Sequence, residues 1–570
     1  MSRTVGTIKL HPQGAWVISA EPDIMIRLKR LLPGVKTHKV KSLIVSDTDV
    51  LGRELEWVLS RWNFEMTAED RRHLGRRATA DREREDLVSK VLAGTAQINP
   101  GVGWLTPALP LREYQRVATD LTRATGHTLL VDELGLGKTV MGLALLEDPA
   151  ARPALAVTLT GLGRQWLREM NKFYPQLRGY ELRTTKADKE IAKIVDRDGN
   201  LAYDLILCNY AKLAAWAPRL SGRVRTVIFD EIQELRRPES LKYDGARHIV
   251  SDATTVMGLS ATPIYNRGGE ILSVMDVISP GCLGTREEFL TEWSSVGYYG
   301  DPNGKVHVTN PAGLRAHLMA KGLFLRRTRE DVGIALPAIS TIEQFVSSDR
   351  GRFEELSGNA IEMAKLILSE NASGAEKWRT AGDLDWRMRQ ATGVAKAPYV
   401  AEFVRLLLEG QDRVVLFGWH REVYDIWLER LREFRPVMYT GTESVAAKAK
   451  AFDEFVRGDS RVLIMSLRSG AGLDGLQDVA STLVFGELDW SPGVHRQAIG
   501  RLGRPGQTRS VLAYFCVSND GSDPIILDTL NIKKMEADQL IEPETGAGSA
   551  TPISSTSHVR KLAEAVLAAA

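Results

Sequence analysis

VDELGLGKTV (131–140) is the stretch that decides the fold. It follows the apolar run TLLV (128–131) and precedes TVMGLALLED (139–148), whose apolar residues recur at helical spacing. A strand, a glycine-containing loop and a helix in this order form the context of a phosphate-binding loop, or P-loop. The stretch therefore predicts a nucleotide site in which backbone N–H groups and a helix N-terminus hold phosphate oxygens.

The polar and glycine positions of this loop have distinct predicted tasks. Gly135 and Gly137 let the backbone approach phosphate without a Cβ in the way. We expect Lys138 to lie against the β- and γ-phosphates of ATP and the Thr139 hydroxyl to ligate Mg²⁺. Asp132 stands where the general pattern GxxxxGK[ST] has its first glycine, which is a departure from that pattern.

A second stretch, VIFDEIQ (227–233), has the composition of an apolar strand that ends in two carboxylates. We expect Asp230 to hold Mg²⁺, directly or through water, and Glu231 to orient and deprotonate the attacking water. An Asp-Glu pair after a strand could instead cap a following helix. Because a P-loop precedes the pair in the same alternating domain, we interpret the pair as catalytic and predict an ATPase lobe.

A third stretch, HRQAIGRLGRPGQ (495–507), places two arginines three residues apart. Arg501 and Arg504 would share one helical face or the turn at its end. Guanidinium groups in that position can stabilise charge on a γ-phosphate bound by another lobe, an effect of about 10³–10⁵ in rate. The alternative is a basic surface helix without a catalytic part.

The arrangement of apolar runs predicts an α/β protein. Short apolar runs alternate with helical segments in two long parts of the chain, which is typical of βαβ units and parallel sheets. The predicted division is a small accessory α+β module at 1–100, an ATP-binding lobe at 101–285, helical protrusions and a linker at 286–400, a second lobe at 401–540 and a flexible tail at 541–570.

Composition narrows the possible functions. Hydrophobic residues make up 44% and charged residues 26% of the 570 residues, as in globular proteins. The net charge is +2, so any affinity for nucleic acid must come from local patches. No apolar run reaches the roughly 18 residues that a membrane span needs, and Cys208, Cys282 and Cys516 do not have metal-site spacing. The charged stretch 71–90 is predicted to be a solvated helix or a linker.

Taken in order, these and further motifs resemble the Swi/Snf-type branch of the superfamily-two helicases. The motifs are LREYQ (111–115), DELGLGKT (132–139), TLTGLGRQWLREM (158–170), LCNYAKL (207–213), DEIQ (230–233), GLSATPIYN (258–266), AKGLFLRRTREDV (320–332), TGTESVAAKAKAFDEF (440–455), SLRSGAGLDGLQ (466–477) and QAIGRLGRPGQ (497–507). In this branch the P-loop begins with Asp, which accounts for Asp132 and implies that Asp132 is one of the nucleotide-binding residues. Two further stretches, 393–423 and 484–498, look most like the annealing-helicase, or HepA-related, subgroup.

The resemblance implies two RecA-like lobes that close on ATP and Mg²⁺ and translocate on double-stranded or forked DNA. The outcome would be remodelling of protein–DNA complexes or annealing of strands. Gln115 would then read adenine. DNA would be held mainly by its phosphates, which carry no sequence information. The candidates for DNA contact and for coupling to ATP are Arg164, Asn209, Arg468, Ser260 and Thr262, and a helix cap or a solvated side chain is the alternative for each.

Some residues are given structural interpretations. Arg326 and Arg327 match the branch's signature between the lobes, and a solvated face is the alternative. We interpret four tryptophans as core or interface anchors rather than base-stacking platforms, namely Trp57, Trp62, Trp104 and Trp166, and we interpret His420 and His495 as structural.

The sequence also departs from the branch. Gln233 stands where the family usually has His, Gly503 stands where it often has His, and the glycines of GAGLDGLQ (470–477) are displaced. The displaced glycines leave open an ATP-gated DNA clamp without productive turnover. A remodeller of a protein partner such as a polymerase, bound through 1–100, and an RNA helicase are further alternatives. We expect a monomeric motor in a bacterial cytoplasm, including that of a virus-infected cell, or in a nucleus if the host is eukaryotic.

Overall fold

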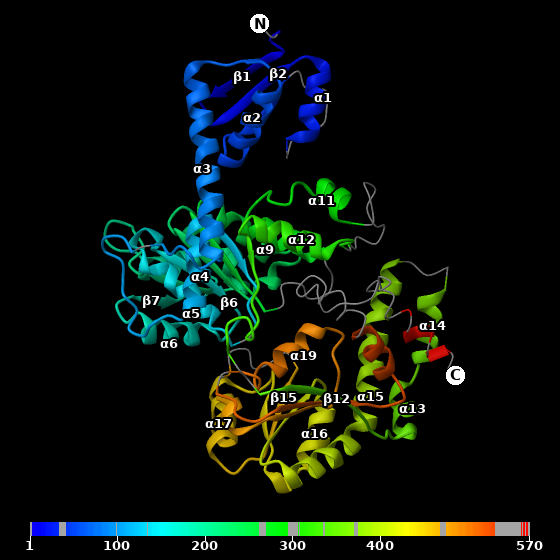
Figure 1. The fold of residues 1–570 in the computed structure, drawn as a ribbon. Coiled ribbons are helices and arrows are strands. Elements are labelled where there is room, and N and C mark those ends of the chain that lie inside the picture. The colour runs from blue at the N-terminus through cyan, green and yellow to red at the C-terminus, as the bar shows by residue number, and fades with distance from the viewer. Residues whose placement is uncertain are drawn as a thin grey trace.

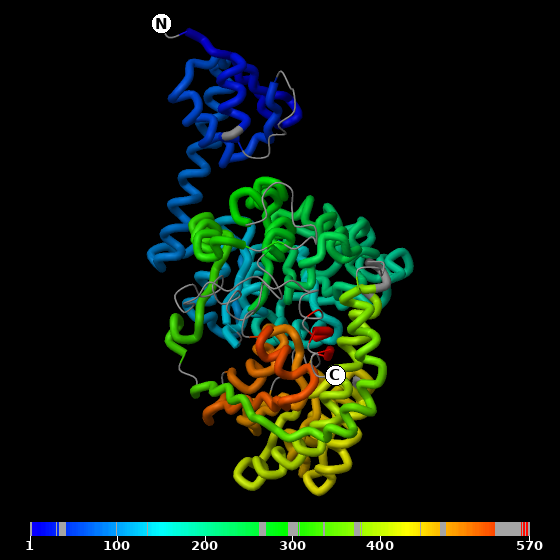
Figure 2. Tube along the Cα trace, turned by 90° about the vertical axis from the view of Figure 1, so that its right-hand side faces the viewer, coloured from blue at the N-terminus to red at the C-terminus, as the bar shows by residue number. Residues whose placement is uncertain are grey.

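The computed structural model describes residues 3–32, 42–98, 100–133, 135–261, 269–294, 306, 308–334, 337–369, 374–467, 473, 475–504, 506–530, 560, 562–564 and 566–567. Three bodies follow one another in space: a small N-terminal module, a first lobe and a second lobe (Figure 1). The view turned by 90° shows the same order, with the module standing away from the lobes at the end of a long helix (Figure 2).

The N-terminal module is a four-stranded sheet with strand order β3-β2-β1-β4. The pairs β1/β2 and β2/β3 are antiparallel, whereas β1/β4 is parallel, so the module mixes both kinds of pairing as an α+β fold does. Helices α1 and α2 contribute to a core around Trp16, which is fully buried. The elements are β1 (Gly6–His11), β2 (Ala15–Ala20), α1 (Pro22–Leu31), β3 (Leu43–Ser46), α2 (Asp49–Arg61) and β4 (Phe64–Glu65).

Helix α3 (Ala68–Leu92) joins the module to the first lobe. Leu74 belongs to the core of the module, whereas Val88 and Val91 belong to the core of the first lobe. The prediction of a solvated helix at 71–90 is confirmed, because most positions of this stretch are exposed or half-buried. Each end of α3 is buried in a different core, which ties the orientation of the module to the lobe.

The first lobe is a seven-stranded parallel sheet with strand order β11-β5-β10-β9-β6-β8-β7. Its strands are β5 (His127–Leu130), β6 (Ala154–Thr158), β7 (Gly179–Glu181), β8 (Leu205–Asn209), β9 (Thr226–Asp230), β10 (Thr255–Leu259) and β11 (Phe324–Leu325). Its helices are α4 (Glu113–Thr125), α5 (Lys138–Ala144), α6 (Gly163–Phe173), α7 (Ala187–Glu190), α8 (Tyr210–Leu220), α9 (Leu241–Val250), α10 (Glu270–Ile278), α11 (Arg286–Trp293) and α12 (Pro311–Ala320).

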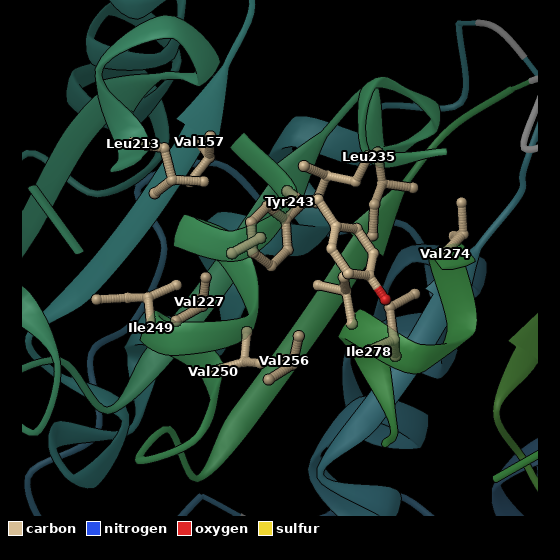
Figure 3. Close-up of a cluster of buried hydrophobic side chains, with 14 of the residues drawn as sticks. Val157, Leu213, Val227, Leu235, Tyr243, Ile249, Val250, Val256, Val274 and Ile278 are labelled. Carbon is tan, nitrogen blue, oxygen red and sulfur yellow. The ribbon is translucent and has the colours of Figure 1, made fainter. Parts of the chain in front are cut away.

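Both faces of this sheet are covered, as expected for parallel strands. Along β9, Val227 and Phe229 face one core, and Ile228 between them faces the other. Figure 3 shows the first of these cores, where Tyr243 and Ile249 of α9 lie near Val227. The continuous apolar run in the sequence follows from burial on two sides.

The second lobe is a six-stranded parallel sheet with strand order β12-β17-β16-β13-β15-β14. Its strands are β12 (Ile339–Phe345), β13 (Val414–Gly418), β14 (Val437–Tyr439), β15 (Val462–Ser466), β16 (Thr482–Phe485) and β17 (Val511–Val517). Its helices are α13 (Arg350–Ser357), α14 (Ala360–Leu368), α15 (Gly374–Gly410), α16 (Arg421–Arg430), α17 (Val445–Arg457), α18 (Leu476–Val479) and α19 (Pro492–Ile499). The α/β fold with two parallel-sheet lobes is therefore confirmed.

Two strands lie where the sequence predicted a mainly helical interval, 286–400. β11 pairs with β5 at the edge of the first sheet, and β12 pairs with β17 at the edge of the second. Both were missed because β11 has two residues and β12 is half exposed, so neither produces a long apolar run. The chain therefore passes from one lobe to the other between 325 and 339.

The described part of the predicted flexible tail is packed. Leu562 and Ala563 are fully buried against Ala364 of α14 and Leu384 of α15. Cys208 and Cys516 are buried free thiols, as predicted, and Cys282 is half-buried. Among the described residues, no helix has both the length and the apolar character that a membrane crossing requires.

Candidate active site

The predicted ATP-site motifs meet at the carboxyl edge of the first sheet. The P-loop follows β5, Ser260 follows β10 and the acid pair closes β9, and these strands are neighbours in the order β5-β10-β9. Parallel strands end at the same edge, so their loops share one crevice, which is where α/β proteins bind ligands.

The P-loop backbone has the conformation that its glycines permit. Gly135 and Gly137 have φ angles of 88° and 81°, in the left-handed region that side chains disfavour. Gly137 is also the N-cap of α5, and a Cβ there would lie 2.5 Å from Nε2 of Gln115. The loop can therefore adopt this shape only with glycine at position 137.

Gln115 supports this loop from α4. Its Nε2 donates to the Leu136 carbonyl oxygen at 3.1 Å, and its Oε1 accepts from the Arg112 backbone N–H at 3.0 Å. Both ends of the amide thus have protein partners. Its predicted contact with adenine stays a prediction, and the geometry adds a second task, which is to brace the P-loop.

Lys138 is the first residue of α5 and lies among three carboxylates. Its Nζ donates to the carbonyl oxygens of Asp132 and Glu133, at 2.5 and 3.1 Å. Burial lowers the pKa of Lys138 to about 8, although nearby carboxylates, Asp132 foremost, oppose the shift. A bound phosphate would restore the ordinary pKa of this ammonium, so the site favours an anionic ligand.

The Asp132 side chain is not turned to the phosphate loop, which corrects its predicted role as a nucleotide ligand. It is fully buried, and its Oδ2 forms an ion pair with Arg327 at 2.5 Å. Arg327 also donates to the Tyr114 carbonyl oxygen, and its guanidinium stacks on the Tyr114 ring. Asp132 therefore joins the P-loop to α4 and to the segment that leaves β11, and it contributes to the loop through its carbonyl oxygen.

The solvated-face interpretation of the neighbouring arginines is wrong. The Arg327 side chain is 13% exposed, and Arg326 donates to the Val131 carbonyl oxygen at 3.1 Å. Two residues further on, Arg329 pairs with Glu133 of the P-loop at 3.2 Å. The segment that leads to the second lobe is thus anchored at consecutive positions of the P-loop.

The acid pair stands at the end of β9, close to Lys138. Asp230 Oδ2 accepts a hydrogen bond of 2.9 Å from Nε1 of Trp166, and the Asp230 carbonyl oxygen accepts from the Tyr210 hydroxyl. Burial, and then the charge of Glu231, raise the pKa of Asp230 to about 7, against the pull of Lys138. The raised pKa means that ionisation of Asp230 is unfavourable in the empty site. A divalent cation would stabilise the ionised carboxylate, so the position is suited to one.

Glu231 has an unusual backbone and two amide partners. Its φ is 56°, which costs a residue with a side chain about 1–2 kcal/mol, and such strain is concentrated at functional sites. Its Oε2 accepts from Nε2 of Gln233, in the first lobe, and at 3.3 Å from Nε2 of Gln497, in the second lobe. Ser260 Oγ donates to Oε1 of Gln233 at 2.7 Å. A hydrogen-bonded chain therefore runs from the end of β10 through Glu231 to the other lobe.

Arg501 and Arg504 lie in the turn just past α19, at the seam between the lobes. Arg501 is 6% exposed, and burial lowers its pKa to about 10, an effect that the charge of Glu231 opposes. Arg504 donates to the carbonyl oxygens of Gly500 and Leu473. Burial lowers the pKa of Arg329 in the first lobe, and the nearby charge of Arg504 adds to that effect. A basic surface helix does not describe these residues, because α19 ends before both arginines and Arg501 is buried.

The other predicted contacts have mixed outcomes. Arg164 is exposed at the second position of α6, as a DNA contact would require. Asn209 caps α8 by accepting from the Lys212 N–H, which is its structural alternative. Ser260 is 1% exposed, which suits coupling rather than direct contact with DNA. Thr262 and Arg468 lie outside the described residues.

Three functional candidates were missed or undervalued by sequence reasoning. Gln497 had no signal beyond its place in QAIGRLGRPGQ, and Gln233 was noted only as a departure. Trp166 is buried as predicted, but an apolar pattern does not indicate that its N–H reaches Asp230. The partners of Trp166 and Gln497 lie more than 60 residues away in the sequence. Gln233 contacts Glu231 two residues away, but the sequence does not show the direction of its side chain.

The donor set fits ATP with Mg²⁺. A hydroxyl at Thr139 and a carboxylate at Asp230 are hard oxygen ligands, and Mg²⁺ is commonly held by one or two such groups together with substrate phosphates. No cluster of three or more His, Cys, Asp or Glu suited to a metal ion occurs among the described residues. The described residues therefore do not include a metal site built from protein ligands alone.

Comparisons with known proteins agree with the motifs. Residues 53–373 match the SNF2-related domain and residues 396–506 the helicase conserved C-terminal domain. The Mus musculus DNA annealing helicase and endonuclease ZRANB3 is 26% identical over 426 residues, which cover 72% of this chain and 39% of that protein. The uncharacterized ATP-dependent helicase YqhH of Bacillus subtilis (strain 168) is 25% identical over 459 residues, which cover 72% of this chain and 76% of that one.

A solved structure, the Sulfolobus solfataricus SWI2/SNF2 ATPase core in complex with dsDNA, is 22% identical, with a TM-score of 0.37. The match covers 82% of this chain and 99% of that chain. The chain spans less than half the length of the ZRANB3 relatives that it matches.

Proposed function

Because the chain belongs to the SNF2-related family, whose domain matches residues 53–373, we propose that it is a DNA-dependent ATPase that translocates on double-stranded DNA. Its translocation remodels protein–DNA complexes or anneals separated strands. The observation that carries the proposal is the position of Glu231, whose Oε2 accepts hydrogen bonds from an amide of each lobe. A catalytic base at the seam would couple hydrolysis to the relative position of the two lobes.

ATP is held by the P-loop, with Lys138 on its phosphates. Thr139 and Asp230 would hold Mg²⁺, which neutralises phosphate charge when it is bound. Glu231 orients water and takes its proton, because its carboxylate lies near Lys138 and reaches Gln497 of the second lobe. Gln233 and Gln497 fix Oε2 of that carboxylate through their N–H groups, so the second oxygen faces the water.

The second lobe completes the site. Arg501 and Arg504 stabilise negative charge on the phosphate as the cleft closes, and they leave it as the cleft opens. If each lobe grips the DNA backbone, closing and opening moves the protein along the duplex. Arg164, Asn209 and Arg468 are the proposed phosphate contacts. Ser260 and Thr262 are the proposed coupling residues, and the Ser260 hydroxyl begins the hydrogen-bonded chain that runs through Gln233 to Glu231.

The test is ATP turnover with no DNA, single-stranded DNA, duplex DNA and forked DNA, across a salt series. Turnover should rise with DNA, and the affinity for DNA should fall steeply with salt, because phosphate contacts release counterions. Equal turnover with and without DNA would exclude the proposal. Measurable turnover of any size excludes an ATP-gated clamp that does not hydrolyse ATP.

A second function is supported by α3. This helix is buried at one end in the module and at the other in the first lobe, so a partner bound to the module would act on the motor through a firm connection. The partner would be a protein such as a polymerase on DNA. Removal of residues 1–66 separates the two functions: loss of fork preference indicates a DNA task for the module, and loss of partner recruitment indicates a protein task.

We further propose a monomeric motor that works wherever its DNA lies, in a bacterial cytoplasm or, in a eukaryotic host, in the nucleus.

A further inference from the structure

We propose that Trp166 is a positioning residue that fixes the Asp230 carboxylate for Mg²⁺ and sets its distance from the P-loop helix. This inference rests on the proposed ATPase function, because it concerns how the chain prepares its own cation ligand. It begins with one contact: Nε1 of Trp166 donates to Oδ2 of Asp230 at 2.9 Å.

The indole is held firmly at that contact. Trp166 is the fourth residue of α6 and is 1% exposed, within the core on one face of the sheet. Water does not reach a buried indole, so loss of the carboxylate would leave the indole N–H without a hydrogen-bond acceptor. The hydrogen bond is therefore a lasting feature of the empty site.

The far end of the same ring lies on the P-loop helix. A Cβ built on Gly142 of α5 would be 3.4 Å from Cη2 of Trp166 and 3.3 Å from Ile228. Gly142 lies one turn beyond Lys138 and Thr139 on that helix. The ring thus spans the gap between the helix that carries Thr139 and the strand that carries Asp230, the two predicted ligands of one cation.

The chemistry of indole suits this task. Its N–H is a donor only, so it can hold Oδ2 without offering a competing acceptor to a cation. It is also neutral, so it orients the carboxylate without cancelling the charge that attracts Mg²⁺, as Lys or Arg would. Trp166 thus holds Oδ2 of Asp230, and we expect the carboxylate to bind the cation in the orientation that this hydrogen bond sets.

The experiment measures binding rather than turnover. The affinity of a fluorescent ADP analogue is determined with Mg²⁺ and with EDTA, for the full chain and for Trp166→Phe. Phe keeps the aromatic packing and loses the N–H. Loss of an outer-shell partner typically lowers metal affinity about 10–100-fold, so the Mg²⁺ concentration for half-maximal effect should rise about 10-fold or more. The affinity in EDTA should not change.

The matched control is Trp216→Phe. Trp216 is a fully buried tryptophan of the same lobe, and its Nε1 donates to the Thr184 carbonyl oxygen at 2.8 Å, away from the acid pair. It should lose stability comparably and keep the normal Mg²⁺ response. If Trp166→Phe and Trp216→Phe respond alike to Mg²⁺, the inference is wrong.

A second variant decides the matter if Trp166→Phe does not fold. Gly142→Val leaves the N–H in place. A Cβ at this position already lies in contact with the ring at 3.4 Å and close to Ile228 at 3.3 Å, so the further carbons of Val would press on this contact. It should weaken the Mg²⁺ effect, and an unchanged effect would overturn the inference. The assay contains no DNA, so a failure of DNA stimulation would leave this result readable.

Discussion

The two lobes each contain a buried ion pair, and the pairs differ in what surrounds them. In the first lobe, Asp132 and Arg327 join the P-loop to the segment that leads to the second lobe. In the second lobe, Lys396 of α15 pairs at 2.6 Å with Asp523, which follows β17, and also donates to the carbonyl oxygen of Cys516 in β17. The first pair lies beside Lys138, whereas the second holds a helix to its own sheet.

The contrast extends to the seam. In the first lobe, side chains hold the two carboxylates of the acid pair by hydrogen bonds: Trp166 donates to Asp230, and Gln233 donates to Glu231. Arg504 in the second lobe is held by backbone carbonyl oxygens in a turn. We infer that the first lobe is pre-organised for ATP. The second lobe supplies the positive charge of its arginines, which moves as that lobe moves.

The largest loss should come from the first lobe. Glu231→Gln removes the proton acceptor but keeps the shape of the side chain, so turnover should fall by roughly 10⁴-fold and be practically abolished. Nucleotide affinity, measured by equilibrium binding, should be retained. Near-normal turnover would remove Glu231 from the chemistry.

Arg504→Ala tests the charge from the second lobe. Turnover should fall by at least about 10³-fold with little change in KM for ATP, because the guanidinium acts on the transition state. Arg509→Ala is the matched control, since Arg509 is an arginine near the same turn that is 43% exposed. Equal effects of the two substitutions would mean that Arg504 has only a structural part.

Lys396→Met should change stability rather than chemistry. Removal of one partner leaves Asp523 buried without its counter-ion, which typically costs about 3–5 kcal/mol of unfolding free energy. Denaturant unfolding of the second lobe measures the loss, and Lys396→Met with Asp523→Leu should recover much of it. Turnover per folded molecule should stay near normal.

Asp132→Asn in the first lobe should instead lower both stability and turnover, because Asp132 pairs with Arg327 beside the P-loop.

The smallest effect concerns pH. The pKa of Lys138 in the empty site is about 8, so the ammonium loses its proton as the pH rises through that value. Affinity for ATP should therefore be full below pH 8 and fall by up to about tenfold per pH unit above it, because the neutral amine attracts phosphate less. Lys138→Arg should abolish this dependence, and binding measured between pH 7 and 9 checks it.

Local patterns were enough to identify the strands and motifs of both lobes. The resemblance to the Swi/Snf-type branch is confirmed by the SNF2-related match. The apolar run at 128–131 and the apolar start of 227–233 are β5 and β9, with small shifts at their ends. Such runs are readable because a strand buried on both faces must be apolar throughout. β11 and β12 lie at sheet edges and lack that constraint.

The sequence by itself determined the lobes, the P-loop and the acid pair, because these depend on residues that are adjacent in the chain. Only the tertiary structure decided that Asp132 holds Arg327, that Trp166 holds Asp230 and that Glu231 meets Gln497. Those partners are brought together by the parallel order of the strands and by the approach of the second lobe. Spacing along the chain carries no record of either.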